Sequence, residues 1–373
     1  MSVDKTKISK LGFGMMRLPK IDGKMDIERI CEMVDIYMKK GFNYFDTAYV
    51  YEGGDSEKAV KAAVVDRYPR ESFYLADKLP VWEMHSEEDR DKLFNISLER
   101  TGAGYFDFYL LHSIEEGANG DNYEKFDCYN WALKKKEEGL IKHFGFSFHG
   151  SPEYLISILD KHPEVEFVQI QLNYTDMDNP IIRSRELHKI LSERNIPIIV
   201  MEPVKGGFLA NPMDPVKKIF DDILEGRSYA SLALRYAASQ EGVFTVLSGM
   251  STEEQVKDNV DLFSDFAELN EAEYKAIDKA VKIIKDVNVI GCTACRYCCT
   301  GCPMNIPIPD VFSAVNAMTI YDEEFRPRMY YRGATDKKGK AKDCIKCGQC
   351  EAICPQHLQI TELLENASMK LDV

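Results

Sequence analysis

The stretch "YFDTA", residues 44–48, is a short apolar and aromatic run that contains one acidic side chain and leads into a polar, glycine-containing loop. Seven runs of similar texture occur elsewhere in the first 265 residues: "LGFGMM" (11–16), "FYLADKL" (73–79), "DFYLLHS" (107–113), "KHFGFSF" (142–148), "FVQIQLN" (167–173), "IPIIVMEP" (196–203) and "VFTVLSGM" (243–250). Helical patterns such as 26–40 and 88–100 separate them. Runs of this kind, alternating with helical segments, predict parallel strands joined by helices.

The number of these β–α units indicates the architecture. Eight units over roughly 250 residues match a TIM (β/α)8 barrel in size and count. A doubly wound open sheet is the alternative, but it would need a G-x-G-x-x-G turn after the first strand. The nearest stretch, "LGFGMMRLP" (11–19), lacks the third glycine and opens no helix. We therefore expect an α/β fold with a TIM barrel in this part of the chain.

Composition excludes several classes of function. The chain has 373 residues, of which 45% are hydrophobic, so it can bury a large core. Its net charge of −14 argues against nucleic-acid binding, because phosphate would be repelled. It has no long uncharged apolar run, so we expect no membrane span. The N-terminal "MSVDKTKISK" has no apolar signal region, and we expect a cytoplasmic protein.

The cysteines are concentrated near the C-terminus. Only Cys31 and Cys128 precede residue 290, while two runs, "CTACRYCCTGCP" (292–303) and "CIKCGQCEAICP" (344–355), hold the other nine. Each run contains C-x2-C-x2-C-x3-C-P, the spacing of bacterial two-cluster ferredoxins, in which the fourth cysteine serves the other cluster. The spacing predicts two [4Fe–4S] clusters. One would be held by Cys292, Cys295, Cys298 and Cys354, and the other by Cys344, Cys347, Cys350 and Cys302.

A zinc site made of four thiolates is the alternative for these cysteines. Zinc usually takes two C-x2-C pairs, whereas here a four-cysteine run is duplicated, which favours clusters. Cys299 lies outside the repeated pattern, and we interpret it as a bystander. The segment 271–287 reads as an amphipathic helix before the first run. We predict a barrel over 1–268, a linker helix over 269–290 and a small, mostly α-helical ferredoxin-like domain over 291–373.

Polar side chains stand at the ends of most of the predicted strands. In a TIM barrel, catalytic groups lie where the strands end and the β–α loops begin. The strand ends carry Asp46, Lys78, His112, Ser147, Asn173, Glu202 and Ser248, and Tyr51 follows in the loop after Asp46. Any one of these residues could simply cap a helix or face solvent. Several together predict an active site at this end of the barrel.

Four of these residues make a coherent set for proton transfer. A tyrosine has an ordinary pKa near 10, which is high for an acid at neutral pH. A nearby ammonium favours the tyrosinate, so we expect Lys78 to lower the pKa of Tyr51. Asp46 would hold Lys78 in place and keep it protonated, and His112 would orient a substrate carbonyl or share the proton relay. Tyr51 would then protonate the carbonyl oxygen while a hydride arrives at the carbon.

The residues in "FDTAYVYEGGDSE" (45–57), "LADKLP" (75–80) and "DFYLLHS" (107–113) resemble the aldo-keto reductases, and the resemblance covers about residues 8–265. It implies a TIM barrel that binds NADPH or NADH across the strand ends without a Rossmann domain. It also implies reduction of a small-molecule carbonyl substrate, with Tyr51 as general acid and Asp46, Lys78 and His112 as its catalytic partners.

The resemblance also implies cofactor contacts. Ser147 and Gln169 would meet the carboxamide, although Phe148 stands where the family usually has asparagine. Met201 takes the place of an aromatic residue under the nicotinamide, which gives a softer thioether contact. Lys205 would face the pyrophosphate. The adenosine end would meet Ser248, Gly249, Gln255 and Asn259. Lys257 is the nearby cation, which leaves the choice between NADPH and NADH open.

The C-terminal region is similar to α-helical ferredoxin domains of electron-transfer subunits, and the whole chain to aldo-keto reductases that carry such a domain. Three hypotheses follow. The chain is an NAD(P)H-dependent carbonyl reductase with structural or redox-sensing clusters. Alternatively, it exchanges electrons with a ferredoxin or flavoprotein partner through its clusters. The third is a barrel that has lost catalysis and serves as a binding module, which the complete set Asp46, Tyr51, Lys78 and His112 opposes.

Overall fold

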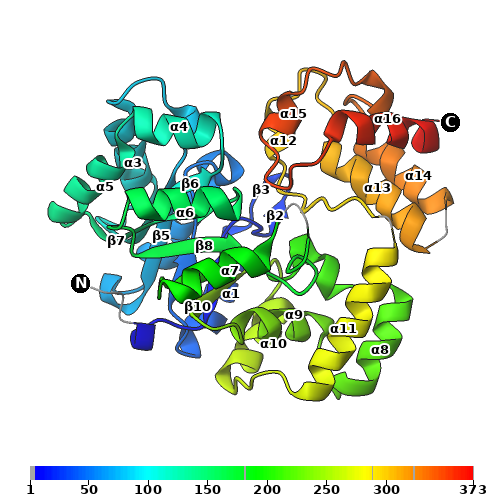
Figure 1. The fold of residues 1–373 in the computed structure, drawn as a ribbon, viewed down its shortest axis with the longest axis horizontal. Coiled ribbons are helices and arrows are strands. Elements are labelled where there is room, and N and C mark those ends of the chain that lie inside the picture. The colour runs from blue at the N-terminus through cyan, green and yellow to red at the C-terminus, as the bar shows by residue number, and fades with distance from the viewer. Residues whose placement is uncertain (1–4, 180–181, 288, 322–323, 373) are drawn as a thin grey trace. The chain divides into compact units, whose positions relative to one another are not determined.

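A computed structural model describes residues 5–179, 182–287, 289–321 and 324–372 of the chain. The chain forms two compact units (Figure 1). The barrel unit comprises Met1–Pro203 and Ser231–Leu269, and the tail unit comprises Val204–Ala230 and Asn270–Val373. The sequence-based division at residues 268 and 290 stays a prediction.

Eight parallel strands close into a barrel in the order β1-β10-β9-β8-β7-β6-β5-β4. They are β1 Leu11–Gly14, β4 Tyr44–Asp46, β5 Tyr74–Leu79, β6 Phe106–Ile114, β7 Ile141–Phe148, β8 Phe167–Gln171, β9 Ile198–Met201 and β10 Val243–Ser248. A hairpin of β2 Lys20–Ile21 and β3 Lys24–Met25 follows β1. The predicted TIM barrel is confirmed, with each predicted run supplying one strand.

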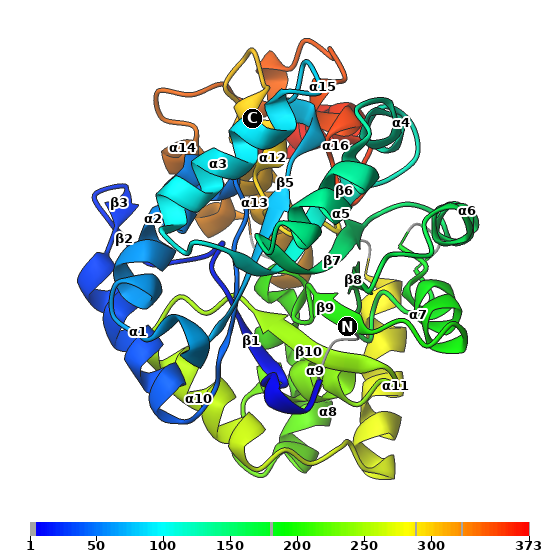
Figure 2. The same ribbon diagram turned by 90° about the vertical axis from the view of Figure 1, so that its left-hand side faces the viewer.

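Helices lie at the periphery of the barrel strands, as Figure 2 shows for α1, α3 and α6. The α-helices of this region are α1 Ile27–Lys39, α2 Asp55–Val60, α3 Asp89–Thr101, α4 Ala118–Lys125, α5 Cys128–Glu137, α6 Pro152–Lys161, α7 Ser184–Glu193, α9 Tyr229–Ala238 and α10 Glu253–Ser264. Short 3₁₀ turns span Lys5–Lys7, Tyr51–Gly54, Arg70–Ser72 and Val81–Glu83, and a π-helical turn, Lys61–Val65, continues α2. Helix α1 illustrates the packing, because it buries Ile30, Met33, Val34 and Tyr37, which share one face of a helix.

The barrel interior is filled by aromatic and aliphatic side chains. The Phe108 ring lies 5.2 Å from that of Tyr44, 5.1 Å from Phe167 and 6.0 Å from Phe244, measured between centroids. Side chains two residues apart on a strand face the same way. Tyr44 and Phe108 face the barrel interior. The same alternation therefore turns polar residues nearer the carboxyl ends of these strands inward as well.

The tail unit is mostly helical, as predicted. Its helices are α8 Asp214–Leu224, α11 Glu271–Asp286, α12 Tyr297–Thr300, α13 Ile308–Tyr321, α14 Phe325–Ala334, α15 Gln349–Ala352 and α16 Ile360–Leu371, with 3₁₀ turns at Lys205–Ala210 and Ala341–Asp343. The core of its C-terminal part includes Val311, Phe312, Ala314, Ile360 and Leu364. The short helices α12 and α15, which lie within the two cysteine runs, are side by side (Figure 1).

No helix in the described ranges combines the length and the hydropathy that a membrane span requires.

Candidate functional site

Lys78 is the centre of the polar group inside the barrel. Its side chain is 1% exposed, and its Nζ donates to Asp46 Oδ1 at 2.5 Å, to the carbonyl of Thr47 at 2.7 Å and to the hydroxyl of Tyr51 at 3.2 Å. An ammonium group has three donors, and all three are used. Strand alternation explains the position, because Lys78 follows the inward-facing Ala76 by two residues.

Tyr51 reaches this site through a tight turn. It begins the 3₁₀ turn Tyr51–Gly54, in which Glu52, Gly53 and Gly54 all have positive φ angles of 53°, 65° and 94°. The φ of Gly54 is one that residues with a Cβ atom rarely adopt, and a Cβ atom there would also press on the Arg100 guanidinium, 2.6 Å away. The turn places the Tyr51 ring with its centroid 4.7 Å from the Lys78 Nζ.

His112 completes the group. It faces the barrel interior on β6, two residues beyond Leu110 and four beyond Phe108. Its ring lies edge-on to Tyr51, with 5.9 Å between centroids, and 5.1 Å from the ring of Trp82. The structure thus brings together Asp46, Tyr51, Lys78 and His112, and adds Trp82 as an aromatic wall.

Burial controls the protonation of Tyr51. It raises the pKa of the phenol well above its ordinary value, and the carboxylates of Asp46 and Glu202 raise it further, while Arg17 opposes them. The expectation that Lys78 lowers this pKa is therefore wrong in its net direction. The Asp46 carboxylate, 2.5 Å from the Lys78 ammonium, weakens the effect of that charge on Tyr51, and the cost of burying a phenolate outweighs what remains.

The two other titratable groups of the set respond to burial in opposite ways. Burial raises the pKa of Asp46, and Lys78 opposes this rise. Burial lowers the pKa of His112 well below its ordinary value, and the charges of Lys78 and His149 lower it further. The imidazole is therefore neutral at physiological pH and can donate only one N–H.

Two residues implied as carboxamide contacts are neighbours at the ends of β7 and β8. Ser147 pairs with Gln169 in the strand register. The Ser147 hydroxyl accepts the backbone N–H of Ser113 at 2.7 Å. The Oε1 atom of Gln169 is buried and has no hydrogen-bond partner within the described part of the chain. This pair presents one hydroxyl and one carbonyl oxygen inside the barrel.

The residues implied at the adenosine end follow β10. Asn259 on α10 donates to the Ser248 hydroxyl at 2.9 Å, and the Gln255 side chain accepts the N–H of Ser251 at 2.7 Å. Gly249 lies against the side chain of Arg17. Met201 ends β9 in the barrel unit, while Lys205 begins a 3₁₀ turn that belongs to the tail unit. The structure thus brings Ser248 and Asn259 together within the barrel unit.

Sequence reasoning missed Arg17. Its guanidinium lies 3.5 Å from the Glu202 carboxylate, and its carbonyl accepts the Ser251 hydroxyl at 2.6 Å. These contacts join the segments that follow β1, β9 and β10. The sequence does contain a sign of this role. Arg17 is a cation three residues beyond the end of the first strand, and the last residues of that strand have no polar side chain.

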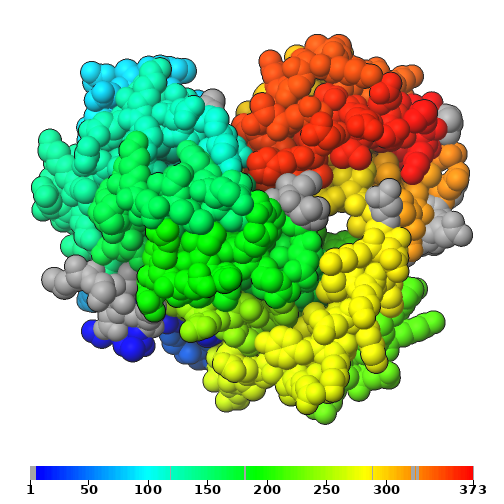
Figure 3. Space-filling model, viewed as in Figure 1, coloured from blue at the N-terminus to red at the C-terminus, as the bar shows by residue number. Residues whose placement is uncertain are grey.

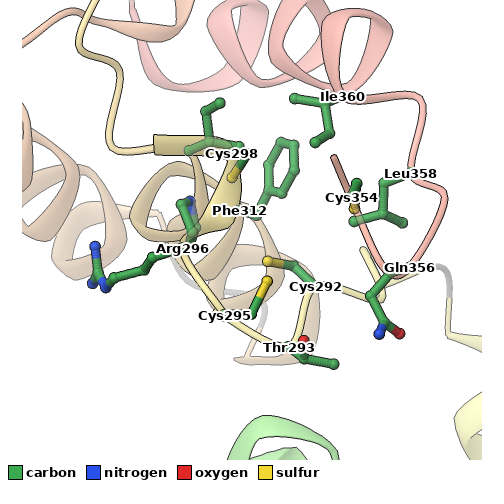
Figure 4. A pocket seen from close by; sticks show the side chains of 12 residues that line it. Cys292, Thr293, Cys295, Arg296, Cys298, Phe312, Cys354, Gln356, Leu358 and Ile360 are labelled. Carbon is green, nitrogen blue, oxygen red and sulfur yellow. The ribbon is translucent and has the colours of Figure 1, made fainter. Parts of the chain in front are cut away.

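In the tail unit, four cysteines from the two runs line one cavity. Cys292, Cys295, Cys298 and Cys354 turn their side chains toward a common space of about 310 Å³, part of which is open to solvent (Figure 4). The rest of the wall is mostly apolar, with Ile308, Pro309, Phe312, Leu358 and Ile360. Elsewhere in the unit, Cys350 is buried, Cys302 and Cys344 are half-buried, and Cys347 is exposed.

The two runs have the same backbone shape. The second residue after the first cysteine has positive φ in both runs, at Ala294 (53°) and Lys346 (55°). The residue after the second cysteine does too, at Arg296 (67°) and Gly348 (76°), and so does the third residue after the last cysteine. Non-glycine residues adopt positive φ rarely, so this repetition indicates that the two cysteine runs have equivalent loop conformations.

Within the described ranges, no three His, Cys, Asp or Glu side chains converge closely enough for a single metal ion. Zinc bound by four cysteines needs all four sulfurs at about 2.3 Å from one atom. The cysteines that line the cavity do not form such a group in the described ranges.

Comparisons with known protein families match one family to the barrel region and another to the cysteine-rich region. A family model described as "Aldo/keto reductase family" matches residues 10–282, and one described as "4Fe-4S dicluster domain" matches residues 291–358. Among curated relatives, the "Uncharacterized oxidoreductase YqkF" of Bacillus subtilis is 26% identical over 307 residues, 74% of this chain and 93% of that protein. The "L-galactose dehydrogenase" of Arabidopsis thaliana is 27% identical over 68% of this chain and 84% of that protein.

Solved structures show the same likeness. The aldo-keto reductase AKR11C1 from Bacillus halodurans, in its holo form, is 26% identical and has a TM-score of 0.60. The match covers 73% of this chain and 92% of that one. An aldo-keto reductase from Klebsiella pneumoniae, solved in complex with NADPH, is 19% identical with a TM-score of 0.57 and covers 73% of this chain and 90% of that one. This second structure supports the fold alone.

The burial of His112 generates a testable prediction. Because burial and Lys78 disfavour the imidazolium, we expect the His112 ring to stay neutral when the pH is lowered from about 8 to about 5.5, across the ordinary histidine pKa. Nitrogen chemical shifts of the histidine rings, assigned with a His112→Gln variant, measure this directly. A histidine-containing model peptide in the same buffer serves as the reference, with an ordinary pKa near 6.5. An imidazolium signal from His112 near pH 6.5 would contradict the account.

Proposed function

The chain belongs to the aldo/keto reductase family, and from that premise we propose that it reduces a small aldehyde or ketone with hydride from NADPH or NADH, with Tyr51 as the proton donor. The observation that carries the proposal is the hydrogen bond of 3.2 Å from the Lys78 ammonium to the Tyr51 hydroxyl. This bond joins a buried phenol to a cation that can stabilise the phenolate left behind when its proton is transferred.

When bound, NADPH or NADH would supply the hydride for the carbonyl carbon, and Tyr51 would give its proton to the carbonyl oxygen, so that an alcohol forms. Burial keeps the proton on Tyr51 until the substrate oxygen begins to gain negative charge. Lys78 then holds the new phenolate, and Asp46 keeps Lys78 in place. The neutral His112 can donate one N–H to the same substrate oxygen and so orient the carbonyl.

For the cofactor, we propose the residues that the family resemblance implies. The buried, unpartnered Oε1 atom of Gln169 suits the NH₂ group of a carboxamide, and the Ser147 hydroxyl lies on the adjacent strand. We assign Met201 to the nicotinamide face and Lys205 to the pyrophosphate. The adenosine end is assigned to Ser248, Gly249, Gln255 and Asn259.

We also propose that the tail unit holds two [4Fe–4S] clusters. The first would bind Cys292, Cys295, Cys298 and Cys354, the four cysteines around the cavity in Figure 4. The second would bind Cys302, Cys344, Cys347 and Cys350. The matched positive-φ positions in the two runs support two equivalent sites. Each run would supply three ligands to one cluster and the fourth ligand to the other, as in two-cluster ferredoxins.

A second candidate function is electron exchange with an acidic one-electron carrier, a ferredoxin or a flavoprotein. Cys347, a proposed ligand of the second cluster, is exposed, and the nearby Ile345 is 60% exposed. In a chain of net charge −14, residues 332–346 contain six basic and two acidic residues. In Figure 3, orange atoms from this part of the chain lie on the visible surface of the tail unit. Such a basic rim would attract an acidic partner to the exposed cluster.

Replacing the proton donor tests the reductase function. We expect Tyr51→Phe to lower kcat for aldehyde reduction about 10²- to 10⁴-fold, because the proton donor is lost while the ring remains. Binding of NADPH, followed by its fluorescence, should change little. A Tyr51→Phe variant that retains wild-type kcat would disprove the assignment of Tyr51.

Removal of one ligand tests the cluster assignment. We expect Cys354→Ala to lower the iron content below about eight atoms per chain and to weaken the visible cluster absorption of anaerobically purified protein. Cys299→Ala is the matched control, because this thiol lies in the first run but outside the repeated pattern. The assignment fails if Cys299→Ala loses iron while Cys354→Ala keeps all of it.

Charge reversal tests the second candidate function. We expect the double variant Lys340→Glu and Lys342→Glu to slow cluster reduction by an acidic ferredoxin about tenfold or more at low salt. The control is Lys282→Glu with Lys285→Glu, two exposed positions on α11 that give the same change in charge. Stopped-flow absorbance at several salt concentrations measures the rates. Equal effects of the two double variants would remove the proposed docking rim.

A further inference from the structure

Asp77 lies on the outer side of the strand that carries Lys78. Adjacent residues of a strand face opposite sides, so Lys78 points into the barrel while Asp77 points toward the helices. Asp77 is fully buried, and its Oδ1 accepts the backbone N–H of Lys78 at 2.7 Å. Its other carboxyl oxygen, Oδ2, is buried and receives no donated hydrogen bond from the described residues.

The carboxyl group of Glu57 on α2 is also buried, with one oxygen that accepts a hydrogen bond and one that does not. It is fully buried, and its Oε2 accepts the Arg100 guanidinium at 2.8 Å. Its Oε1 is buried and, like Asp77 Oδ2, has no donor among the described residues. The side chains of Glu57 and Asp77 lie within hydrogen-bonding range of each other. Two acceptor-only carboxylates cannot bond to each other, but one proton between them satisfies both oxygens.

The surroundings identify Asp77 as the residue that carries this proton. Burial raises the pKa of Asp77 well above its ordinary value, and the charge of Glu57 raises it further. The backbone N–H and the charge of Lys78 act in the opposite direction but do not reverse the shift. Glu57, by contrast, has a cation as its partner, since Arg100 donates to it. Tyr109 on β6 and Tyr51 also lie within electrostatic range of Asp77, and burial keeps both phenols neutral.

The Asp77–Glu57 pair lies next to the segment that carries Tyr51. Glu57 is three residues beyond the turn Tyr51–Gly54, and Arg100 also donates to the carbonyl of Tyr49 at 3.2 Å and stacks 4.5 Å from its ring centroid. The segment that carries Tyr51 is therefore fixed on both sides of that residue. On one side Arg100 holds it through the Tyr49 carbonyl, and on the other side Glu57 lies beside Asp77 on the strand of Lys78.

We propose that Asp77 and Glu57 share one proton, and that this carboxyl pair is a positioning device that holds the Tyr51 turn against Lys78. This proposal rests on the proposed function, in which Tyr51 donates the proton to the substrate and Lys78 holds the resulting phenolate. Loss of the shared proton would leave two adjacent buried carboxylates, whose repulsion would push α2 away from β5. The bond between Lys78 and Tyr51 would then lengthen.

Infrared spectroscopy tests the pair without any need for activity. At pH 7 the wild-type protein should show the C=O band of a buried protonated carboxylic acid, and Asp77→Asn should remove it. Glu57→Gln should remove it as well, because an amide can donate to an ionised Asp77. Asp176→Asn is the control and should leave the band in place, since Asp176 already accepts two amide N–H bonds at 2.7 Å. Absence of the band, or its persistence in Asp77→Asn, would overturn the shared proton.

Kinetics test the positioning role. Asparagine can accept from the Lys78 N–H and donate to Glu57 without a titratable proton, whereas leucine can do neither. We expect Asp77→Asn to keep kcat within about threefold of wild type, and Asp77→Leu to lower it about tenfold or more with little change in KM. Wild-type kcat should fall at alkaline pH, and Asp77→Asn should move this fall to higher pH. Equal kcat values for Asp77→Asn and Asp77→Leu would overturn the role, and inactivity of the wild type would refute the proposed function while leaving the infrared result valid.

The free energy of unfolding gives an independent test, which can be made even if the Asp77→Leu variant does not fold. Because the folded state holds a proton that a free aspartate has lost, the free energy of unfolding should decrease as the pH rises from about 5 toward the raised pKa of Asp77. Asp77→Asn should show a smaller decrease over the same range. Identical slopes for the two proteins, measured by urea unfolding, would contradict the raised pKa.

Discussion

The burial of one ammonium group constrains the rest of the barrel site. Lys78 is 1% exposed, and a charge in that position is tolerated only if its donors are all satisfied. The carboxylate of Asp46, the carbonyl of Thr47 and the hydroxyl of Tyr51 provide the three acceptors. Removing one partner of such a buried ion pair costs on the order of 3–5 kcal/mol, so the pair fixes the ends of β4 and β5 relative to each other.

The same low-polarity environment decides the protonation of the neighbouring groups. Tyr51 keeps its proton, His112 remains neutral, and Asp77 is driven toward its protonated form, because burial penalises each charged form. Besides Asp46, the Lys78 ammonium therefore contacts only neutral acceptors within the described residues, the Thr47 carbonyl and the Tyr51 hydroxyl. A proton donor that remains neutral until its proton is needed suits a reaction in which negative charge develops on the substrate oxygen only during hydride transfer.

In the tail unit, the positions of the cysteine thiols follow from backbone conformation rather than from charge. Its two cysteine runs place positive φ angles at the same offsets from their cysteines, and each run contains a four-residue helix, α12 or α15. These features turn three thiols of the first run toward the cavity that also receives Cys354 from the second run. Within the tail unit, the loop after β9 packs closely on the first run, since a Cβ atom at Gly206 would come within 2.6 Å of the carbonyl of Thr293. That part of the loop begins at Val204, three residues beyond the end of β9.

Periodicity and local pattern were enough to predict the eight strands, the inward polar residues at their ends and the duplicated cysteine spacing. They were not enough to predict the direction of the Tyr51 pKa shift, which depends on how completely the folded barrel excludes water from the phenol. Nor did they reveal Arg17 or the pairing of Asp77 with Glu57. Those contacts join the loop after β1 to the ends of β9 and β10, and a strand to a helix earlier in the chain, so only the closed barrel brings the side chains together.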